Sequence, residues 1–211
     1  MRKAQFVAKS IFVLAILGMA AACSPQSNAP TEPPASRGDA ELRPLSDFDA
    51  FTDNESRADA LFDEIGRVIQ HPRCVNCHPR TDRPLQGEEG ALHQPMVVRG
   101  AGGMGQPGMF CTTCHGAENY RNVPGNPAWR LAPAEMAWEG KSLSEICLQI
   151  KDEERNGGLS LMELGEHMAE DELVAYGWNP PAHLDRAPGD QESFGALFHA
   201  WIDAGAHCPS G

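Results

Sequence analysis

The sequence predicts a mostly α-helical protein with long irregular loops and no substantial sheet. Apolar residues recur at helical spacing in separate segments, and no segment alternates like a strand. Gly and Pro together make up 38 of the 211 residues, about 18 %, against roughly 12 % in average proteins. Apolar residues reach 41 % and aromatic residues 7 %. The side-chain core is therefore thin for this length, and we expect something other than side chains to fill part of the interior.

The first expected helix begins at a capping box formed by Thr52 and Glu55, in which each side chain satisfies a free backbone N–H near the helix start. It runs to about Gln70, and Pro72 ends it because proline lacks an N–H. Its apolar face is Ala58, Leu61, Phe62, Ile65, Val68 and Ile69.

Three further helices are expected in the C-terminal half of the chain. A capping box at 142–145 begins one of them, which is expected to end at 156–158, and residues 160–163 open a further short helix. The last helix covers about 191–204. Residues 79–141 show no sustained periodicity, so they are expected to form a long functional loop region.

Residues 1–22 are typical of an export signal. A basic start is followed by a short apolar run at 11–17 and by small residues at 20–22. The next residue, Cys23, completes a pattern like a bacterial lipobox, so we expect cleavage and lipidation of this cysteine. Ordinary cleavage after Ala22 and retention as an uncleaved anchor are the alternatives. The first two outcomes place the mature protein in the periplasm.

The domain organisation follows from this interpretation. Residues 23–46 are expected to form a lipid-anchored, Pro-rich disordered tether, and 47–211 a single folded domain. Removing residues 1–22 takes three basic residues and no acidic ones from a chain of net charge −12, which leaves −15. Such a charge argues against a nucleic-acid partner and favours a neutral or basic protein surface.

The pattern C-x-x-C-H occurs twice, as Cys74, Cys77 and His78, and as Cys111, Cys114 and His115. This is the attachment signature of c-type haem. Each thiol adds to one vinyl group of the porphyrin, and the adjacent histidine supplies the proximal iron ligand. The sequence therefore predicts two haem c groups.

A zinc site and a redox dithiol are the alternative uses of paired cysteines. Neither requires a histidine directly after each pair. Two more cysteines, Cys147 and Cys208, are expected to form a disulfide in an oxidising compartment, worth about 2–4 kcal/mol; two unpaired thiols are the alternative. Because only 37 residues separate the motifs, we expect one compact dihaem cytochrome c-type domain rather than two tandem domains.

The sixth iron ligands are less determined by the sequence. His93 lies in the loop between the motifs and is expected to close over the first haem, while His167 lies on the apolar face of a short helix. Either histidine could instead be an ordinary surface or core residue. His71 could bind the haem of the other motif, and Met96 or Met168 would raise the reduction potential if it were the ligand.

Several longer stretches give the sequence a family resemblance. They are residues 71–79, 109–115, 137–142, 155–158, 166–168 and 200–203. Over about residues 60–209 the chain resembles exported bacterial dihaem cytochrome c-like proteins labelled isoquinoline 1-oxidoreductase subunit. The enzyme of that name is a molybdenum hydroxylase, whose molybdopterin and iron–sulfur motifs this chain lacks. The resemblance implies an electron acceptor for a periplasmic dehydrogenase of that type.

Two classes of function are compatible with these features. The first is an electron carrier without catalytic residues, which passes electrons from a redox protein or periplasmic dehydrogenase to the respiratory chain. The second is a small peroxidase-like dihaem enzyme or a haem-based sensor with one open iron. We expect the carrier, held at the membrane by its lipid anchor, because no convincing distal catalytic set is evident.

Overall fold

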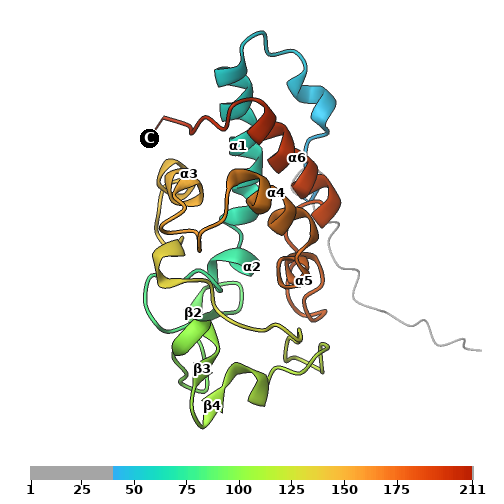
Figure 1. Ribbon diagram of the computed structural model, residues 1–211. Helices are drawn as coiled ribbons and strands as arrows, with labels where there is room; N and C mark the ends of the chain where they lie inside the picture. The colour runs from blue at the N-terminus through green and yellow to red at the C-terminus, as the bar shows by residue number, and fades with distance from the viewer. Residues whose placement is uncertain (1–39, 211) are drawn as a thin grey trace, which may run out of the picture. The chain divides into compact units, whose positions relative to one another are not determined.

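The computed structural model describes residues 40–210. The predicted signal segment, Cys23 and most of the predicted tether lie outside the described residues. The described part is mostly helical, with six α-helices, two two-stranded sheets and many loops (Figure 1). The predicted fold class is confirmed at this level. No helix between residues 40 and 210 has the length and apolar character needed to cross a membrane.

Helix α1 (Asn54–Ile69) forms as predicted, but its cap is one residue later than expected. Asp53, not Thr52, is the N-cap, and its carboxylate accepts a hydrogen bond from the backbone N–H of Ser56 at 2.8 Å. A carboxylate at this position also interacts favourably with the positive end of the helix dipole. After α1, Pro72 does more than end the helix, because it occupies the first turn of α2 (Pro72–Val75), where no N–H is required.

The predicted capping box is present at the start of α3 (Leu143–Lys151). Helix α4 (Leu161–Glu170) begins where predicted, and Ser160 and Glu163 form a capping box there as well. The expected end of α3 at 156–158 is wrong, because the backbone already turns extended at Asp152. Asn156 has a different role from the expected helix stop. Its buried amide donates to the carbonyls of Ile150 and Leu159, and so holds the α3–α4 loop closed.

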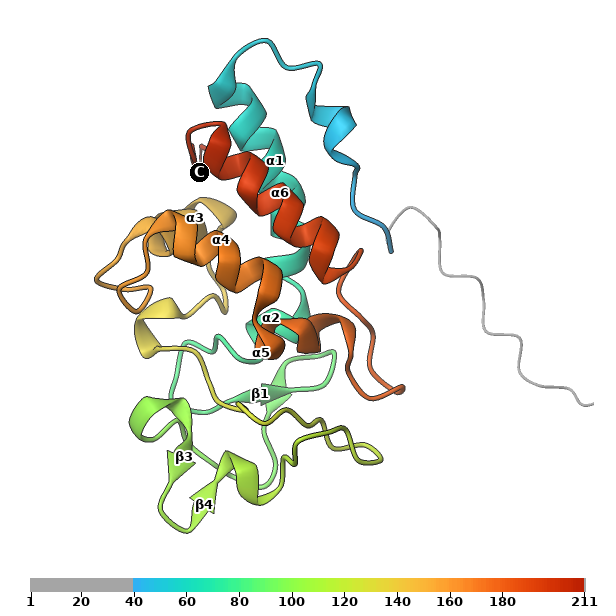
Figure 2. The same cartoon turned by 45° about the vertical axis from the view of Figure 1, so that its right-hand side comes forward.

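Helix α6 (Gln191–Asp203) packs against both α1 and α4 and contributes side chains to the hydrophobic core (Figure 2). The approach to α4 depends on small residues, because a Cβ on Gly195 would lie 2.5 Å from the Cβ of Ala169. The short helix α5 (Glu172–Ala175) follows α4 directly, and a 3₁₀ helix (Tyr176–Trp178) continues it. The largest fully buried side chains include Phe48, Phe62, Phe194, Phe198 and Trp201.

A disulfide joins Cys147 in α3 to Cys208 in the C-terminal segment, as the sequence predicted. It closes a long stretch of chain that contains α4, α5 and α6. The side chain of Cys147 is fully buried, and the indole N–H of Trp201 donates to the carbonyl of His207 at 2.7 Å. The C-terminal segment is therefore attached to the helical core by both a covalent bond and a hydrogen bond.

Residues 79–141 contain no α-helix, in agreement with their missing periodicity. Their regular structure is two antiparallel pairs, β1 (Leu85–Gln86) with β2 (Ala91–Leu92), and β3 (Gly105–Gln106) with β4 (Met109–Phe110). Short 3₁₀ helices occupy Ala101–Gly103, Cys111–Thr113 and Ala134–Met136. In both views the β3–β4 part lies at the end of the molecule away from α1 and α6 (Figures 1 and 2).

Arg99 holds this loop region together from inside. It is only 7 % exposed, and its guanidinium donates to the carbonyl oxygens of Pro79, Thr81 and Ala132. Its Nε lies 3.3 Å from the carboxylate of Asp82. The guanidinium of Arg99 therefore satisfies backbone carbonyl groups that have no partner in a sheet or helix.

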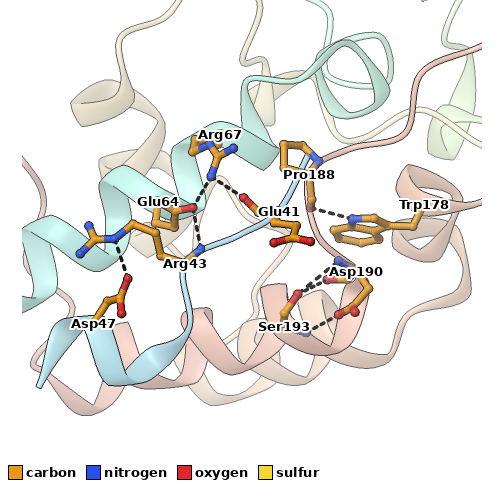
Figure 3. A network of polar contacts seen from close by, with 9 residues as sticks. All are labelled: Glu41, Arg43, Asp47, Glu64, Arg67, Trp178, Pro188, Asp190 and Ser193. Carbon is orange, nitrogen blue, oxygen red and sulfur yellow. Dashed lines mark hydrogen bonds and ion pairs between the residues drawn. The ribbon is translucent and has the colours of Figure 1, made fainter. Parts of the chain in front are cut away.

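The folded part begins earlier than the expected residue 47. Glu64 of α1 accepts from the backbone N–H of Arg43 at 3.1 Å and from Arg67 at 2.5 Å (Figure 3). Arg67 also donates to the carbonyl of Glu41, and the N–H of Gly189 donates to the carbonyl of Ala40. A 3₁₀ helix (Leu45–Phe48) then buries Phe48 completely. Residues 40–46 thus belong to the fold rather than to a free tether.

Candidate functional site

Both C-x-x-C-H motifs adopt a single helical turn. In the first motif the N–H of His78 donates to the carbonyl of Cys74 at 3.2 Å, and in the second the N–H of His115 donates to that of Cys111 at 3.0 Å. In each motif the second cysteine also donates to the carbonyl of the first. Residues three and four apart lie on one face of a helical turn. This conformation therefore places both thiols and the histidine of each motif on one side of the chain.

The His78 imidazole is held by two neighbours from a distant segment. Its Nδ1 lies 2.7 Å from the carbonyl oxygen of Met136, and its ring stacks on Trp138 with centroids 3.5 Å apart and planes 6° apart. A carbonyl can only accept, so Nδ1 carries the proton and Nε2 keeps its lone pair. Burial lowers the pKa of His78 to about 4, although the bond to Met136 opposes this. The ring is therefore neutral near pH 7, which is the form that binds a metal.

His115 repeats this arrangement with different residues. Its Nδ1 lies 2.8 Å from the carbonyl oxygen of Pro124, and its ring stacks on Trp129 with centroids 4.5 Å apart and planes 9° apart. Burial lowers its pKa as well. Hydrogen bonding at the second ring nitrogen is the usual way in which proteins orient a metal-binding histidine. Both motif histidines thus share one supporting geometry.

Sequence reasoning did not find the two stacking tryptophans. A signal was present, because Trp129 and Trp138 lie in the segment without periodicity, where a large aromatic residue has no helix face to occupy. The structure uses them as rigid surfaces against the motif histidines. Trp129 also meets Tyr176 edge to face, with centroids 4.9 Å apart.

The four motif cysteines are free thiols. Burial raises the pKa of Cys74 to about 12 and that of Cys77 to about 11. A redox dithiol requires the opposite shift, because the thiolate is the reactive species. Among residues 40–210, no three His, Cys, Asp or Glu side chains are grouped as ligands of one metal ion. This arrangement differs from a zinc site built from both cysteine pairs.

Each motif faces a cavity. The first motif lines a cavity of about 790 Å³ through Cys74, Cys77 and His78. The second motif lines a cavity of about 330 Å³ through Cys111, Cys114 and His115. Both volumes fall within the range of roughly 300–1,000 Å³ that cofactor and ligand sites occupy. Five residues line both cavities, so the two share a wall: Arg73, Cys77, Arg130, Leu131 and Tyr176.

His93 lines the cavity of the second motif, not that of the first as expected. Its ring centroid lies 5.9 Å from that of His115, with the planes at 51°. The reason is local: the β1–β2 hairpin starts just after the first motif, and the N–H of His93 donates to the carbonyl of Pro84. This bond directs the end of the hairpin toward the second motif. Nδ1 of His93 lies 3.0 Å from the carbonyl oxygen of Pro95, so Nε2 is again the nitrogen left for a metal.

His167 lines the larger cavity from α4. The Nδ1 atom of His167 lies 3.5 Å from the carboxylate of Asp171. The nearby charge of His167 also contributes to lowering the pKa of His78. Met168, which is 5 % exposed, lines the same cavity. The first motif therefore faces two candidate sixth ligands on one helix.

The other candidates are placed less favourably. His71 caps α2, where its Nδ1 accepts from the N–H of Arg73 at 3.2 Å, so its lone pair is already used. Met96 is 68 % exposed. His183, which sequence reasoning did not select, lines the smaller cavity from an exposed loop.

Comparison of the chain with protein-family models, with curated proteins and with solved structures gave no match. The residues of the site therefore provide the basis for a functional proposal. These fit haem c in three respects: two free thiols in each motif, a neutral histidine with Nε2 left for iron, and an adjoining cavity of suitable volume. The candidate fourth and fifth members of each site, a tryptophan and a second histidine, come from other segments.

Proposed function

We propose that this protein is a periplasmic dihaem c-type cytochrome that transfers electrons. One observation carries the proposal. Two motifs without further sequence similarity have the same surroundings: a histidine with Nδ1 bound to a carbonyl, a stacked tryptophan, and a cavity that contains a second histidine. The same combination of a bound histidine, a stacked tryptophan and a cavity with a second histidine is not expected to occur twice without a shared role.

The residues have distinct roles in this proposal. The thiols of Cys74, Cys77, Cys111 and Cys114 would hold two haems through their vinyl groups, and Nε2 of His78 and of His115 would bind iron. Haem c supplies one-electron chemistry at its iron. His93 closes the second site and His167 the first, so neither keeps an open position for a substrate. Two six-coordinate sites with a common wall favour electron transfer over bond-making chemistry, so we propose a carrier rather than an enzyme.

The partner and location rest on the sequence. The signal segment and Cys23 support a lipoprotein in the periplasm, and the resemblance supports a periplasmic dehydrogenase, of the molybdenum hydroxylase type, as electron donor. The respiratory chain is the proposed acceptor. The net charge of −15 after processing favours a basic docking surface on the partner and makes a nucleic-acid partner unsuitable.

The direct test uses the full chain, exported in a bacterium that assembles haem c. Haem is quantified per chain, electron paramagnetic resonance spectra are recorded, and carbon monoxide is added to the reduced protein. Two covalently bound haems, both low-spin and silent to carbon monoxide, are expected. Absence of covalent haem would overturn the proposal. A carbon monoxide shift would replace the carrier by a peroxidase-like enzyme or a haem-based sensor.

The membrane anchor has its own test. Cys23→Ser removes the lipid acceptor, so the variant is expected to move from the membrane fraction to the soluble periplasmic fraction. Ser24→Ala, at the adjacent position, is the matched control and should stay with the membrane. A Cys23→Ser protein that remains in the membrane fraction would contradict lipidation.

A further inference from the structure

Arg73 lies at the boundary of the two cavities and lines both. Its side chain is 1 % exposed. Its Nη2 donates to the carboxylate of Glu88 at 2.9 Å and to the carbonyl of Gly87 at 3.1 Å. It therefore places a buried positive charge between the two candidate haem sites.

The hydrogen bonding of this guanidinium is incomplete. Its Nε is buried and has no hydrogen-bond partner among the described residues. A buried N–H of a charged group without a partner costs free energy. Glu88 balances the charge from one edge only, and it is itself 33 % exposed. The Nε–H is therefore free for a further acceptor, although the Tyr176 phenol also interacts with the guanidinium.

The neighbours of Arg73 indicate what kind of acceptor fits. Arg130, an exposed residue, lines the same two cavities, so a second basic residue borders the junction. Tyr176, also common to both, has its pKa raised by burial, while the charge of Arg73 opposes that rise. A junction with two cations and a phenol suits a carboxylate, which a guanidinium binds with strong, directional hydrogen bonds.

We propose that Nε of Arg73 donates to a propionate carboxylate of the haem at the second motif, because Cys74 and Cys77 beside it would hold the opposite, vinyl edge of the first haem. The inference rests on the proposed function, because haem is the group that would bring a carboxylate there. In this position Arg73 would do two things. It would orient the carboxylate at the shared wall, and its charge would stabilise the reduced, less positive state of both irons. Arg73 is thus a positioning residue that raises both reduction potentials.

The test compares variants of the full holoprotein by potentiometric titration and by the propionate bending band in the resonance Raman spectrum. Arg73→Gln is expected to lower both potentials and to shift the band. Arg73→Lys keeps the charge but loses Nε, so the band is expected to shift while the potentials change less. Arg43→Gln removes an equal charge from an exposed position on the N-terminal segment, outside both cavities, and should change neither.

Glu88→Gln keeps Arg73 in place and covers the case in which the Arg73 variants do not fold. It leaves the guanidinium charge less balanced, so both potentials are expected to rise. Two haems with unchanged potentials and an unchanged Raman band in Arg73→Gln would overturn the inference and leave the proposed function intact. A wild-type protein without covalent haem would overturn the proposed function first, so the two failures are distinguishable.

Discussion

The ring centroids of His93 and His115 lie 5.9 Å apart, with the ring planes at 51°. Two imidazoles on opposite sides of one metal ion, at metal–nitrogen distances of about 2.0–2.1 Å, have centroids roughly 6 Å apart. In both rings Nδ1 is engaged by a backbone carbonyl, which leaves Nε2 on each. The spacing of the two rings is thus the one that the proposed bis-histidine iron would require.

The first prediction follows from this pair. His93→Ala removes the proposed sixth ligand of the second haem, so that haem is expected to become high-spin and to bind carbon monoxide when reduced. About half of the total haem should respond, because the other site is unchanged. Optical and electron paramagnetic resonance spectra measure both effects. His183→Ala alters another histidine of the same cavity and should leave the spectra as in the wild type. A reduced His93→Ala protein that does not bind carbon monoxide would exclude His93 as the ligand.

The second prediction separates two neighbours on α4. His167→Ala is expected to open the first haem to carbon monoxide, whereas Met168→Leu should not, because it preserves the apolar volume at a buried position. The absorption band of methionine-bound ferric haem, near the red end of the spectrum, gives an independent measurement. If Met168→Leu opens the site and His167→Ala does not, the ligand is methionine and the potential of that haem is higher.

The elements that local chemistry determines were predictable from the sequence. The capping boxes at Ser142 and Ser160 begin α3 and α4 because a hydroxyl and a carboxylate three residues apart complete each other's hydrogen bonds. The Cys147–Cys208 pairing followed from counting the cysteines that the motifs leave over. In each case the information lies within a few residues or in a count.

Long-range placement was not predictable in the same way. The association of His93 with His115 depends on how the β1–β2 hairpin turns back, which has no sequence period. The stacking of Trp138 on His78 joins segments of an irregular loop region. The course of that region also depends on hydrogen bonds from the buried Arg99 to backbone carbonyl groups. Every residue has such a carbonyl, so the sequence does not show which ones Arg99 will bind. The sequence therefore predicts the motif residues of the candidate site but not the distant residues that pack against them.

The third prediction concerns the disulfide. Cys147→Ala with Cys208→Ala removes the link across 61 residues and is expected to lower the free energy of unfolding by about 2–4 kcal/mol. Urea unfolding followed by circular dichroism measures the difference. The wild type under reducing conditions serves as the control and should match the double variant. Equal stability of the oxidised wild type and the variant would contradict a stabilising bond.

The fourth prediction is a pH dependence at the start of α6. The N–H and hydroxyl of Ser193 lower the pKa of the Asp190 carboxyl below its ordinary value of 3.8. A carboxyl with a lower pKa in the folded state stabilises the fold above its unfolded pKa, and this contribution disappears as the pH falls through the folded pKa. Asp190→Ala is therefore expected to cost about 1 kcal/mol at pH 7 and progressively less below about pH 4. Urea unfolding across pH 3–7 measures this. Asp203→Ala, at the other end of α6, leaves the Asp190 cap intact and should show no such loss at pH 7.

The last prediction tests the contact of α6 with α4, which supports the His167 side of the larger cavity. Gly195→Ala gains helix propensity of about 1 kcal/mol, but its Cβ would lie 2.5 Å from that of Ala169. Overpacking of a tight core costs about 1–3 kcal/mol, so we expect net destabilisation. Ala169→Gly removes the opposing methyl group, and the double variant should recover part of the loss relative to the sum of the two single changes. Urea unfolding of the four proteins gives this coupling. Strict additivity would mean that α4 and α6 separate slightly without resistance, and the position of His167 would then depend on other contacts.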